Sequence, residues 1–296
     1  MVHDAVIVGG SYAGLSAALQ LARARRSVAV IDAGQRRNRF ARSSHGFLGQ
    51  DGRDPARIAG EARDQLMRYG TVSWRAGTAT EAAADGEVFR IEIEGGETVE
   101  ARRLVLATGV RDRLPDVPGL AERWGRSVFH CPYCHGYELE QGRIGVLATS
   151  PLSMHQALML PDWGPTTLFL NGAFSPDEDQ LAQLHRRGVR VEAEPVEHLA
   201  GEKGVTVALL DGRSVACEGL FVATATEIAS PLAERLGCGL EDGPAGRFIR
   251  TDGMKETTVA GVFACGDAAR GAGSVALAVG DGTLAGVSAH RSLMFG

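Results

Sequence analysis

Two cysteines separated by two residues lie near the middle of the chain, in the stretch His130-Cys131-Pro132-Tyr133-Cys134-His135. Two thiols at this spacing can close into a disulfide and reopen, and a neighbouring imidazolium or helix N-terminus makes one of them a thiolate at neutral pH. This chemistry is a two-electron redox switch. The motif could also be half of a zinc site, or it could form a purely structural disulfide. A structural zinc site needs four ligands, and Cys217, Cys238 and Cys265 lie far apart without a second closely spaced pair. We therefore interpret the motif as redox-active.

The size and composition of the chain are those of a soluble protein of about two domains. Its 296 residues are 44% hydrophobic, which is enough for a large core. The net charge of −5 comes without a basic patch, so we expect no nucleic-acid partner. No apolar run approaches the length of a membrane span, and the first residues lack the basic start of a signal peptide. We expect a cytoplasmic protein, and in that reducing compartment a CxxC pair is more often catalytic than structural.

The N-terminal stretch has the pattern of a dinucleotide-binding unit. Residues Ala5–Val8 predict a strand, a glycine-rich turn follows at Gly9–Gly14, and Leu15–Ala22 has the periodicity of a helix. Such a turn lets a pyrophosphate approach the backbone, and the helix N-terminus offers it free N–H groups. A second predicted strand, Ser27–Ile31, ends at Asp32, whose carboxylate would hold the adenosine ribose hydroxyls.

The segment after this unit alternates strand and helix patterns. The loop Ser43–Gly52 is rich in glycine and too polar for a core, so it could wrap a flavin or simply turn. His45 within it is the kind of residue that usually hydrogen-bonds a loop, and we give it no catalytic role. Pro115 and Pro118 mark a linker into a second domain. The other elements predicted here are a helix at Pro55–Tyr69 and strands at Val72–Thr80, Val88–Ile93 and Arg103–Ala107.

A second strand–turn–helix unit follows the cysteines, but its turn has a different composition. The predicted strand Ile144–Ala148 leads into a helix that begins near Leu152, and the next strand is Thr167–Leu170. The turn Ala148–Ser153 contains no glycine, and Pro151 removes a backbone donor. The residues after this second strand, Asn171–Phe174, offer no arginine for a ribose phosphate. We therefore predict a nicotinamide-type domain whose binding site has degenerated.

The C-terminal part contains a further candidate for flavin contacts. The stretch Thr257–Asp267 predicts a short strand that ends in Gly266-Asp267, and a helix is predicted from about Ser274. The aspartate could hold the ribityl hydroxyls of a flavin, and the positive helix N-terminus could stabilise the reduced isoalloxazine ring. The alternative is an ordinary strand-to-helix turn in which the aspartate caps the helix.

In this order along the chain, the motifs resemble the low-molecular-weight thioredoxin reductase family over essentially the full length. The matching pieces are the Gly9–Gly14 turn with Asp32, the strand end Ala107–Gly109, the Cys131–Cys134 motif and Thr258–Asp267. The resemblance implies an α/β fold of two Rossmann-like, three-layer dinucleotide-binding domains, with the second inserted in the first. The FAD-binding domain would comprise residues 1–114 and 243–296, and the inserted module with the CxxC would comprise residues 115–242. It also implies a homodimer.

The resemblance implies roles for the two cysteines as well: Cys134 would face the flavin, and Cys131 would exchange with the substrate. Two features depart from a thioredoxin reductase, namely the degenerate nicotinamide site and His135, which stands where those enzymes carry an aspartate. Both features look like those of the flavin dithiol oxidases that close disulfides in small natural products such as gliotoxin, holomycin and romidepsin. In that branch molecular oxygen is the electron acceptor.

We therefore expect an FAD-dependent dithiol oxidase that closes a disulfide in a small-molecule dithiol and passes the electrons to O2, giving H2O2. His135, and also His130, would take the thiol protons, because an unperturbed imidazole titrates near neutrality. A histidine bonded to backbone is the other interpretation of His130. One alternative function is a disulfide reductase that uses NADPH at an atypical site or reduced ferredoxin. The other is a non-enzymatic flavoprotein whose CxxC reports redox state to a partner.

The expected flavin contacts include one departure from the usual GxGxxG pattern. Ser11 stands at the position of the middle glycine, and its side chain is small enough to keep the backbone approach. We expect no metal site. The residues predicted to bind FAD are Gly9, Gly10, Ser11, Tyr12, Ala13, Gly14, Asp32, Ala33, Asn38, His45, Gln50, Ala79, Ala107, Thr108, Gly109, Gly266, Asp267, Ser274 and Val275.

Overall fold

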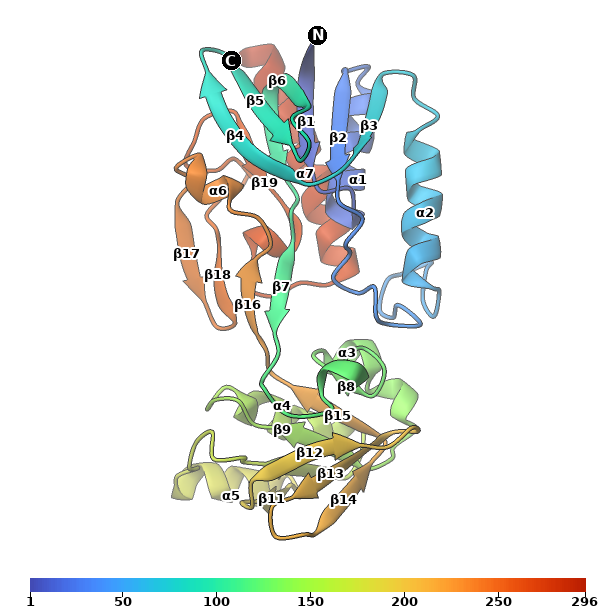
Figure 1. Cartoon of the computed structure of the whole chain (residues 1–296), viewed down its shortest axis with the longest axis vertical. Helices are drawn as coiled ribbons and strands as arrows, with labels where there is room; N and C mark the ends of the chain where they lie inside the picture. The colour runs from blue at the N-terminus through green and yellow to red at the C-terminus, as the bar shows by residue number, and fades with distance from the viewer.

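The first body of the molecule is built around a sheet to which both ends of the chain contribute. In the computed structural model, which describes residues 1–296, five strands run parallel in the order β3-β2-β1-β6-β19, and β5 and β4 continue antiparallel from the first half of β6 (Figure 1). The strands are β1 (Val2–Val8), β2 (Val28–Asp32), β3 (Val72–Ala76), β4 (Ala79–Asp85), β5 (Val88–Ile93), β6 (Thr98–Leu106) and β19 (Val262–Ala264). Residues Ala5–Val8 are all buried, as expected for a parallel strand covered on both faces.

Alternate side chains of these strands enter two different cores. Ile7 packs with helices α1 (Tyr12–Arg23), α2 (Pro55–Leu66) and α7 (Val275–Phe295), whereas Val6 and Val8 pack with the β4–β5 hairpin on the opposite face. The period of two in a strand sends neighbouring side chains to opposite faces, so both faces of the sheet are covered. This arrangement gives the three-layer architecture expected from the sequence.

The second body is an insertion with its own parallel sheet, in the order β11-β10-β9-β15-β8. An antiparallel sheet, β12-β13-β14, contributes to the core on one face, and α4 and α5 pack on the other. Its elements are β8 (Val128–Phe129), β9 (Ile144–Leu147), β10 (Thr166–Phe169), β11 (Arg190–Glu192), β12 (Val196–Ala200), β13 (Val205–Leu209), β14 (Ser214–Cys217), β15 (Gly219–Val222), α3 (Pro132–His135), α4 (Ser153–Met159), α5 (Glu178–Arg186) and the short 3-10 helices η1 (Ala121–Arg123), η2 (Tyr137–Leu139) and η3 (Leu160–Asp162). The fold therefore consists of two Rossmann-like bodies, the second inserted in the first, as predicted.

Two strands carry the chain between the bodies. β7 (Val110–Arg113) leads down and β16 (Ala225–Ile228) leads back, and they pair antiparallel with Asp112 opposite Thr226 (Figure 1). The chain then continues on the first body through α6 (Leu232–Arg235), β17 (Leu240–Gly243), β18 (Gly246–Ile249) and η4 (Gly266–Ala269). Leu232 and Ala233 are buried in the core that contains Val6. We therefore propose that the third segment begins near residue 229 rather than at 243.

Two of the predicted strands differ in extent from the sequence pattern. The stretch Val72–Thr80 forms two strands that separate at Gly77, whose φ of +149° and close approach to the Ile93 side chain exclude a Cβ. Of Thr257–Asp267 only Val262–Ala264 is a strand, because the preceding residues form local bonds such as that from the Val262 N–H to the Val259 carbonyl. No helix combines the length and the apolar character needed to cross a bilayer.

The close packing of α7 on α1 gives a test of the fold. A Cβ at Gly282 would lie 2.0 Å from the carbonyl oxygen of Ala13, whereas Gly280, two residues earlier on the same helix, has no atom within 4 Å of that position. We expect Gly282→Ala to lower the free energy of unfolding by about 1–3 kcal/mol through overpacking. Gly280→Ala should raise it by about 0.5–1 kcal/mol, because alanine is the better helix former. Urea denaturation of both variants checks this, and equal effects would contradict the packing described here.

Candidate active site

The two motif cysteines form a disulfide at the start of a short helix that faces the first body. α3 begins at Pro132, whose fixed φ suits the first helical position, and Cys131 is its N-cap (Figure 1). Cys131 and Cys134 are bonded to each other, with their Cα atoms 5.3 Å apart. Both line a cavity of about 910 Å³ that extends from the N-terminal glycine turn to α3. The predicted redox pair therefore faces a space large enough for a cofactor.

The glycine turn at the other end of this cavity is held by very close backbone contacts. Gly9 has a φ of +104°, and a Cβ there would lie 2.2 Å from the carbonyl oxygen of Ala107. The Gly10 N–H donates to Oδ1 of Asp32 at 3.0 Å. Ser11 is the N-cap of α1, and its side chain makes no capping hydrogen bond, so the first-turn N–H groups remain free for an anionic ligand. These features are what a pyrophosphate requires.

Two buried polar atoms beside the cavity support the fit of a flavin dinucleotide. Asn38 Oδ1 and Thr108 Oγ1 are buried without a hydrogen-bond partner in the protein, and both residues line the cavity. Buried polar atoms are normally paired, so such orphans indicate groups that a ligand satisfies. Together with the glycine turn and Asp32, they fit FAD.

Most of the residues predicted to bind FAD are brought together around this cavity, and three are not. Gly10 and Gly14 shape the turn from behind: a Cβ at Gly14 would lie 1.8 Å from the carbonyl oxygen of Gly9. Gln50 does not line the cavity, because its Oε1 accepts a hydrogen bond from Arg53 Nη1 at 2.5 Å. The predicted residues that line it are Gly9, Ser11, Tyr12, Ala13, Asp32, Ala33, Asn38, His45, Ala79, Ala107, Thr108, Gly109, Gly266, Asp267, Ser274 and Val275.

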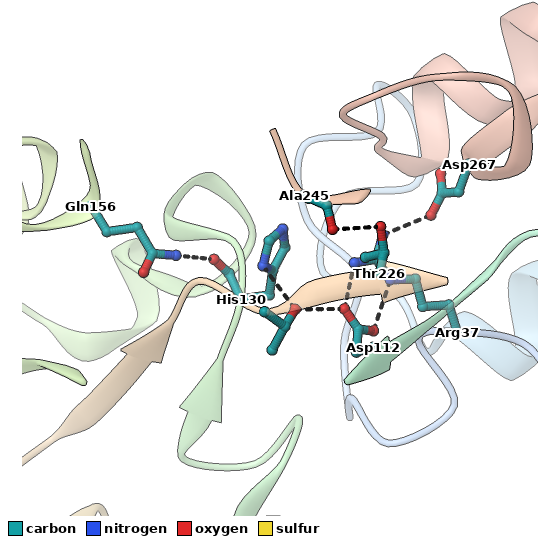
Figure 2. A network of polar contacts seen from close by, with 8 residues as sticks. Arg37, Asp112, His130, Gln156, Thr226, Ala245 and Asp267 are labelled. Carbon is teal, nitrogen blue, oxygen red and sulfur yellow. Dashed lines mark hydrogen bonds and ion pairs between the residues drawn. The ribbon is translucent and has the colours of Figure 1, made fainter. Parts of the chain in front are cut away.

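A partly buried ion-pair network beside the cavity was not predicted from the sequence. Arg37 donates from Nε and Nη2 to both carboxylate oxygens of Asp112, at 2.9 and 2.6 Å, and from Nη1 to Oδ2 of Asp267 at 2.8 Å (Figure 2). Burial alone would lower the pKa of Arg37, but its hydrogen bonds to the two carboxylates raise it above its ordinary value. Arg37 and Asp112 lie 75 positions apart, and no short-range pattern links them.

The histidines that line the cavity differ in their surroundings. The ring of His135 stacks on Phe129 with centroids 4.3 Å apart, and its nitrogens make no hydrogen bond to a protein group. Burial, together with the charge of His45, lowers the pKa of His135 to about 4. His45 lies 3.3 Å from Oε1 of Glu138 through Nδ1 and contacts the Ser43 hydroxyl through Nε2, so it ties the flavin-side loop to the segment after α3.

His130 has polar partners, in contrast to His135. Its Nδ1 lies 3.5 Å from Oγ1 of Thr224, and its backbone carbonyl accepts a hydrogen bond from Gln156 Nε2 at 2.7 Å. Burial and the charge of Arg37 lower the pKa of His130 below its ordinary value. His130 is therefore neutral at neutral pH and anchored at both its backbone and its ring.

In the turn of the second dinucleotide-type unit, two serine side chains of the turn accept hydrogen bonds from its own backbone N–H groups. The Thr149 N–H donates to the Ser153 hydroxyl at 3.1 Å, and the Leu152 N–H donates to the Ser150 hydroxyl at 3.3 Å. Ser153 is completely buried. In a phosphate-binding turn these backbone N–H groups would be free. Side chains of the turn thus occupy the donors that a second dinucleotide would need.

Fold and site together define a flavin-dependent thiol–disulfide oxidoreductase of the thioredoxin reductase type. The chain belongs to the pyridine nucleotide-disulphide oxidoreductase family, whose sequence profile matches residues 3–282.

Several known proteins are similar to the chain along nearly its whole length. Thioredoxin reductase tcpT of Claviceps purpurea is 36% identical over 306 residues, which cover 99% of this chain and 95% of that protein. The crystal structure of an oxidoreductase from Agrobacterium tumefaciens is 58% identical with a TM-score of 0.97, covering 100% of this chain and 99% of that one. The crystal structure of HlmI is 36% identical with a TM-score of 0.93, covering 99% and 93%.

The low pKa of His135 predicts a pH-dependent stability. The unfolded chain protonates this histidine near pH 6.5, whereas the folded chain resists protonation down to about pH 4. The free energy of unfolding should therefore fall as the pH drops below 6.5, by up to about 2 kcal/mol at pH 5 for this group alone. His135→Phe, which keeps an aromatic ring beside Phe129, should remove that part of the slope. Urea denaturation of both proteins from pH 8 to pH 5 measures it, and parallel curves would contradict the assignment.

Proposed function

We propose that the protein is an FAD-dependent dithiol oxidase that closes a disulfide in a small-molecule dithiol and uses O2 as the electron acceptor, giving H2O2. The observation that carries this proposal is the turn after β9. There the Ser153 and Ser150 hydroxyls accept hydrogen bonds from the backbone N–H groups that a nicotinamide dinucleotide would need. With that entry closed to NADPH, electrons enter through sulfur. The Cys131–Cys134 disulfide, which lines the cavity, would be the group that accepts them.

The two cysteines exchange with the substrate in two steps. A substrate thiolate attacks Sγ of Cys131, the Cys131–Cys134 bond breaks, and its electron pair leaves on the Cys134 sulfur. The second substrate thiolate then attacks the substrate sulfur of the mixed disulfide, Cys131 leaves as a thiolate, and the product departs with its new disulfide. The substrate has lost two electrons and two protons, and the enzyme pair is reduced.

The side chains around the cavity would hold the cofactor and the protons. Asp32 would bind the adenosine ribose, the first turn of α1 the pyrophosphate, and Asn38 and Thr108 would satisfy their buried oxygens on FAD. When bound, FAD supplies a two-electron acceptor that O2 can reoxidise. One of the two histidines at the ends of the CxxC motif, His130 or His135, would take a proton from a substrate thiol.

We further propose that the protein is a cytoplasmic homodimer. The outer face of α7 supports the dimer, because Leu277, Val287 and Met294 are exposed at helical spacing on one side. Light scattering of the purified protein tests it, and a single-chain mass at micromolar concentration would contradict it. Fractionation of cells that express the protein tests the location.

The choice of electron donor is decided by comparing reductants of the bound flavin. In an anaerobic stopped-flow experiment, a dithiol such as dithiothreitol should bleach the flavin rapidly, whereas NADPH should not. In air, the protein should consume one O2 and form one H2O2 for each dithiol oxidised. Rapid bleaching by NADPH, or by reduced ferredoxin but not by dithiols, would instead identify a disulfide reductase.

The disulfide itself is tested with serine variants. Cys131→Ser and Cys134→Ser should each abolish dithiol-dependent O2 consumption while the bound flavin spectrum remains, because one thiol cannot close the ring. Cys238→Ser is the matched control: this buried thiol lies 3.5 Å from the Thr257 hydroxyl and takes no part in the exchange. Turnover that survived in either motif variant would overturn the proposed role of the pair.

A further inference from the structure

The network beside His130 connects three segments that are far apart in the sequence. Thr224 lies between β15 and β16, Asp112 is in β7, and Arg37 follows β2. Figure 2 shows Arg37 between Asp112 and Asp267, with His130 on the far side of Asp112. The Thr224 hydroxyl donates to Oδ1 of Asp112 at 2.8 Å. His130 Nδ1 contacts the same hydroxyl oxygen of Thr224.

The proton count of this chain of contacts determines which nitrogen of His130 carries hydrogen. A hydroxyl has one proton, and that of Thr224 is donated to a carboxylate, so its oxygen is left as an acceptor. His130 Nδ1 must then be the donor, and Nε2 of the neutral ring is the unprotonated nitrogen. The contact of 3.5 Å is long, as catalytic hydrogen bonds often are before substrate binds. Nε2 makes no hydrogen bond to the protein, and in Figure 2 it points away from Asp112.

The protonation state of Asp112 is determined by the groups that contact its carboxylate. Its side chain is 7% exposed. Burial alone would raise the pKa of Asp112, but the hydrogen bonds and charge of Arg37, with the Thr224 hydroxyl, lower it below its ordinary value. Asp112 therefore stays an anion and faces the ring of His130 through Thr224. An anion in this position stabilises the imidazolium that forms when Nε2 accepts a proton.

We propose that Thr224 and Asp112 are positioning residues that hold His130 as the Nδ1–H tautomer, so that its Nε2 is the base for the substrate thiol that attacks Cys131. The inference rests on the proposed dithiol exchange. The thiol proton moves to Nε2, the new thiolate bonds to Sγ of Cys131, and the broken disulfide leaves its electron pair on Cys134. The positive ring then faces the Asp112 carboxylate through Thr224, while Arg37 stays bonded to both Asp112 and Asp267.

This assignment differs from the emphasis on His135 that the sequence alone favours. His135 stacks on Phe129 and has no acceptor behind its ring, so nothing nearby stabilises its protonated form. The charged groups that face His130 are Arg37, Asp112 and Asp267, and the backbone carbonyl of Val222 adds an acceptor. Of the two, only His130 both lines the cavity and faces an anion, Asp112, through the Thr224 hydroxyl. We call His130, Thr224 and Asp112 the relay.

Direct observation of the tautomer tests the relay without turnover. In the oxidised holoenzyme labelled with ¹⁵N-histidine, the His130 signal should show hydrogen on Nδ1 and none on Nε2 at pH 8, and Thr224→Val should give a mixture of tautomers. Thr224→Ser should restore the wild-type pattern. Thr226→Val is the matched control, because its hydroxyl bonds to the Ala245 carbonyl outside the relay (Figure 2). Hydrogen on Nε2 in the wild type would overturn the proposal.

Kinetics with dithiothreitol test the role of the base. We expect Thr224→Val to lower the second-order rate of anaerobic flavin reduction about 10-fold at pH 7, and His130→Gln about 100-fold. Both deficits should shrink towards pH 9, where the substrate thiol is already ionised, and Thr226→Val should match the wild type at all pH values. A larger loss in His135→Gln than in His130→Gln would overturn the assignment. If the wild type does not oxidise dithiothreitol at all, the proposed function fails, and the tautomer measurement still decides the relay.

Discussion

A positive charge that is largely withdrawn from water has to be matched by negative charges, and in this protein the match joins distant parts of the chain. Arg37, from the loop after β2, lies between Asp112 on the descending strand β7 and Asp267 at the start of η4. Removing one partner would leave a partly buried charge uncompensated, a loss that costs about 3–5 kcal/mol where the pair is fully buried. The loop, the crossing strand and η4 are therefore held in one arrangement, and the walls of the cavity depend on it.

The same constraint places the redox pair. The inserted body is attached only through β7 and β16, so its orientation depends on what those two strands contact. Asp112 of β7 lies opposite Thr226 of β16 and forms an ion pair with Arg37 of the first body. His45 and Glu138 add a second contact between the flavin-side loop and the segment after α3. The disulfide consequently lies at the cavity that the first body builds, and neither body alone contains the complete site.

Two units of the same topology have diverged in chemistry within one chain. In the first, Gly9 and Gly14 allow the backbone to approach so closely that a Cβ would clash, and the donors of the helix end stay free. In the second, the hydroxyls of Ser150 and Ser153 accept hydrogen bonds from backbone N–H groups of the corresponding turn. Two such units can share their packing and differ in their turns, because the sheet depends on buried apolar strands and binding depends on a few turn residues.

The sequence by itself determined the features that depend on close spacing. The CxxC pair, the Gly9–Gly14 turn and the glycine-free turn before Ser153 could all be predicted, because their geometry is set by neighbouring residues and by the strand that leads into them. The resemblance built on them predicted the inserted two-body fold correctly. Among the predicted flavin contacts, Gln50 lies off the cavity, and its side chain accepts a hydrogen bond from the nearby Arg53.

Only the tertiary structure decided which polar groups from distant parts of the sequence meet around the crossing strands β7 and β16. Arg37 and Asp112 are separated by 75 positions, and Thr224 and His130 by 94, so no local pattern pairs them. Their contact depends on how β7 and β16 cross between the bodies, which is a result of packing both sheets. For the same reason the sequence favoured His135, the neighbour of Cys134, over His130 as the base. In the folded chain His130 faces Asp112 through Thr224, whereas His135 stacks on the apolar ring of Phe129.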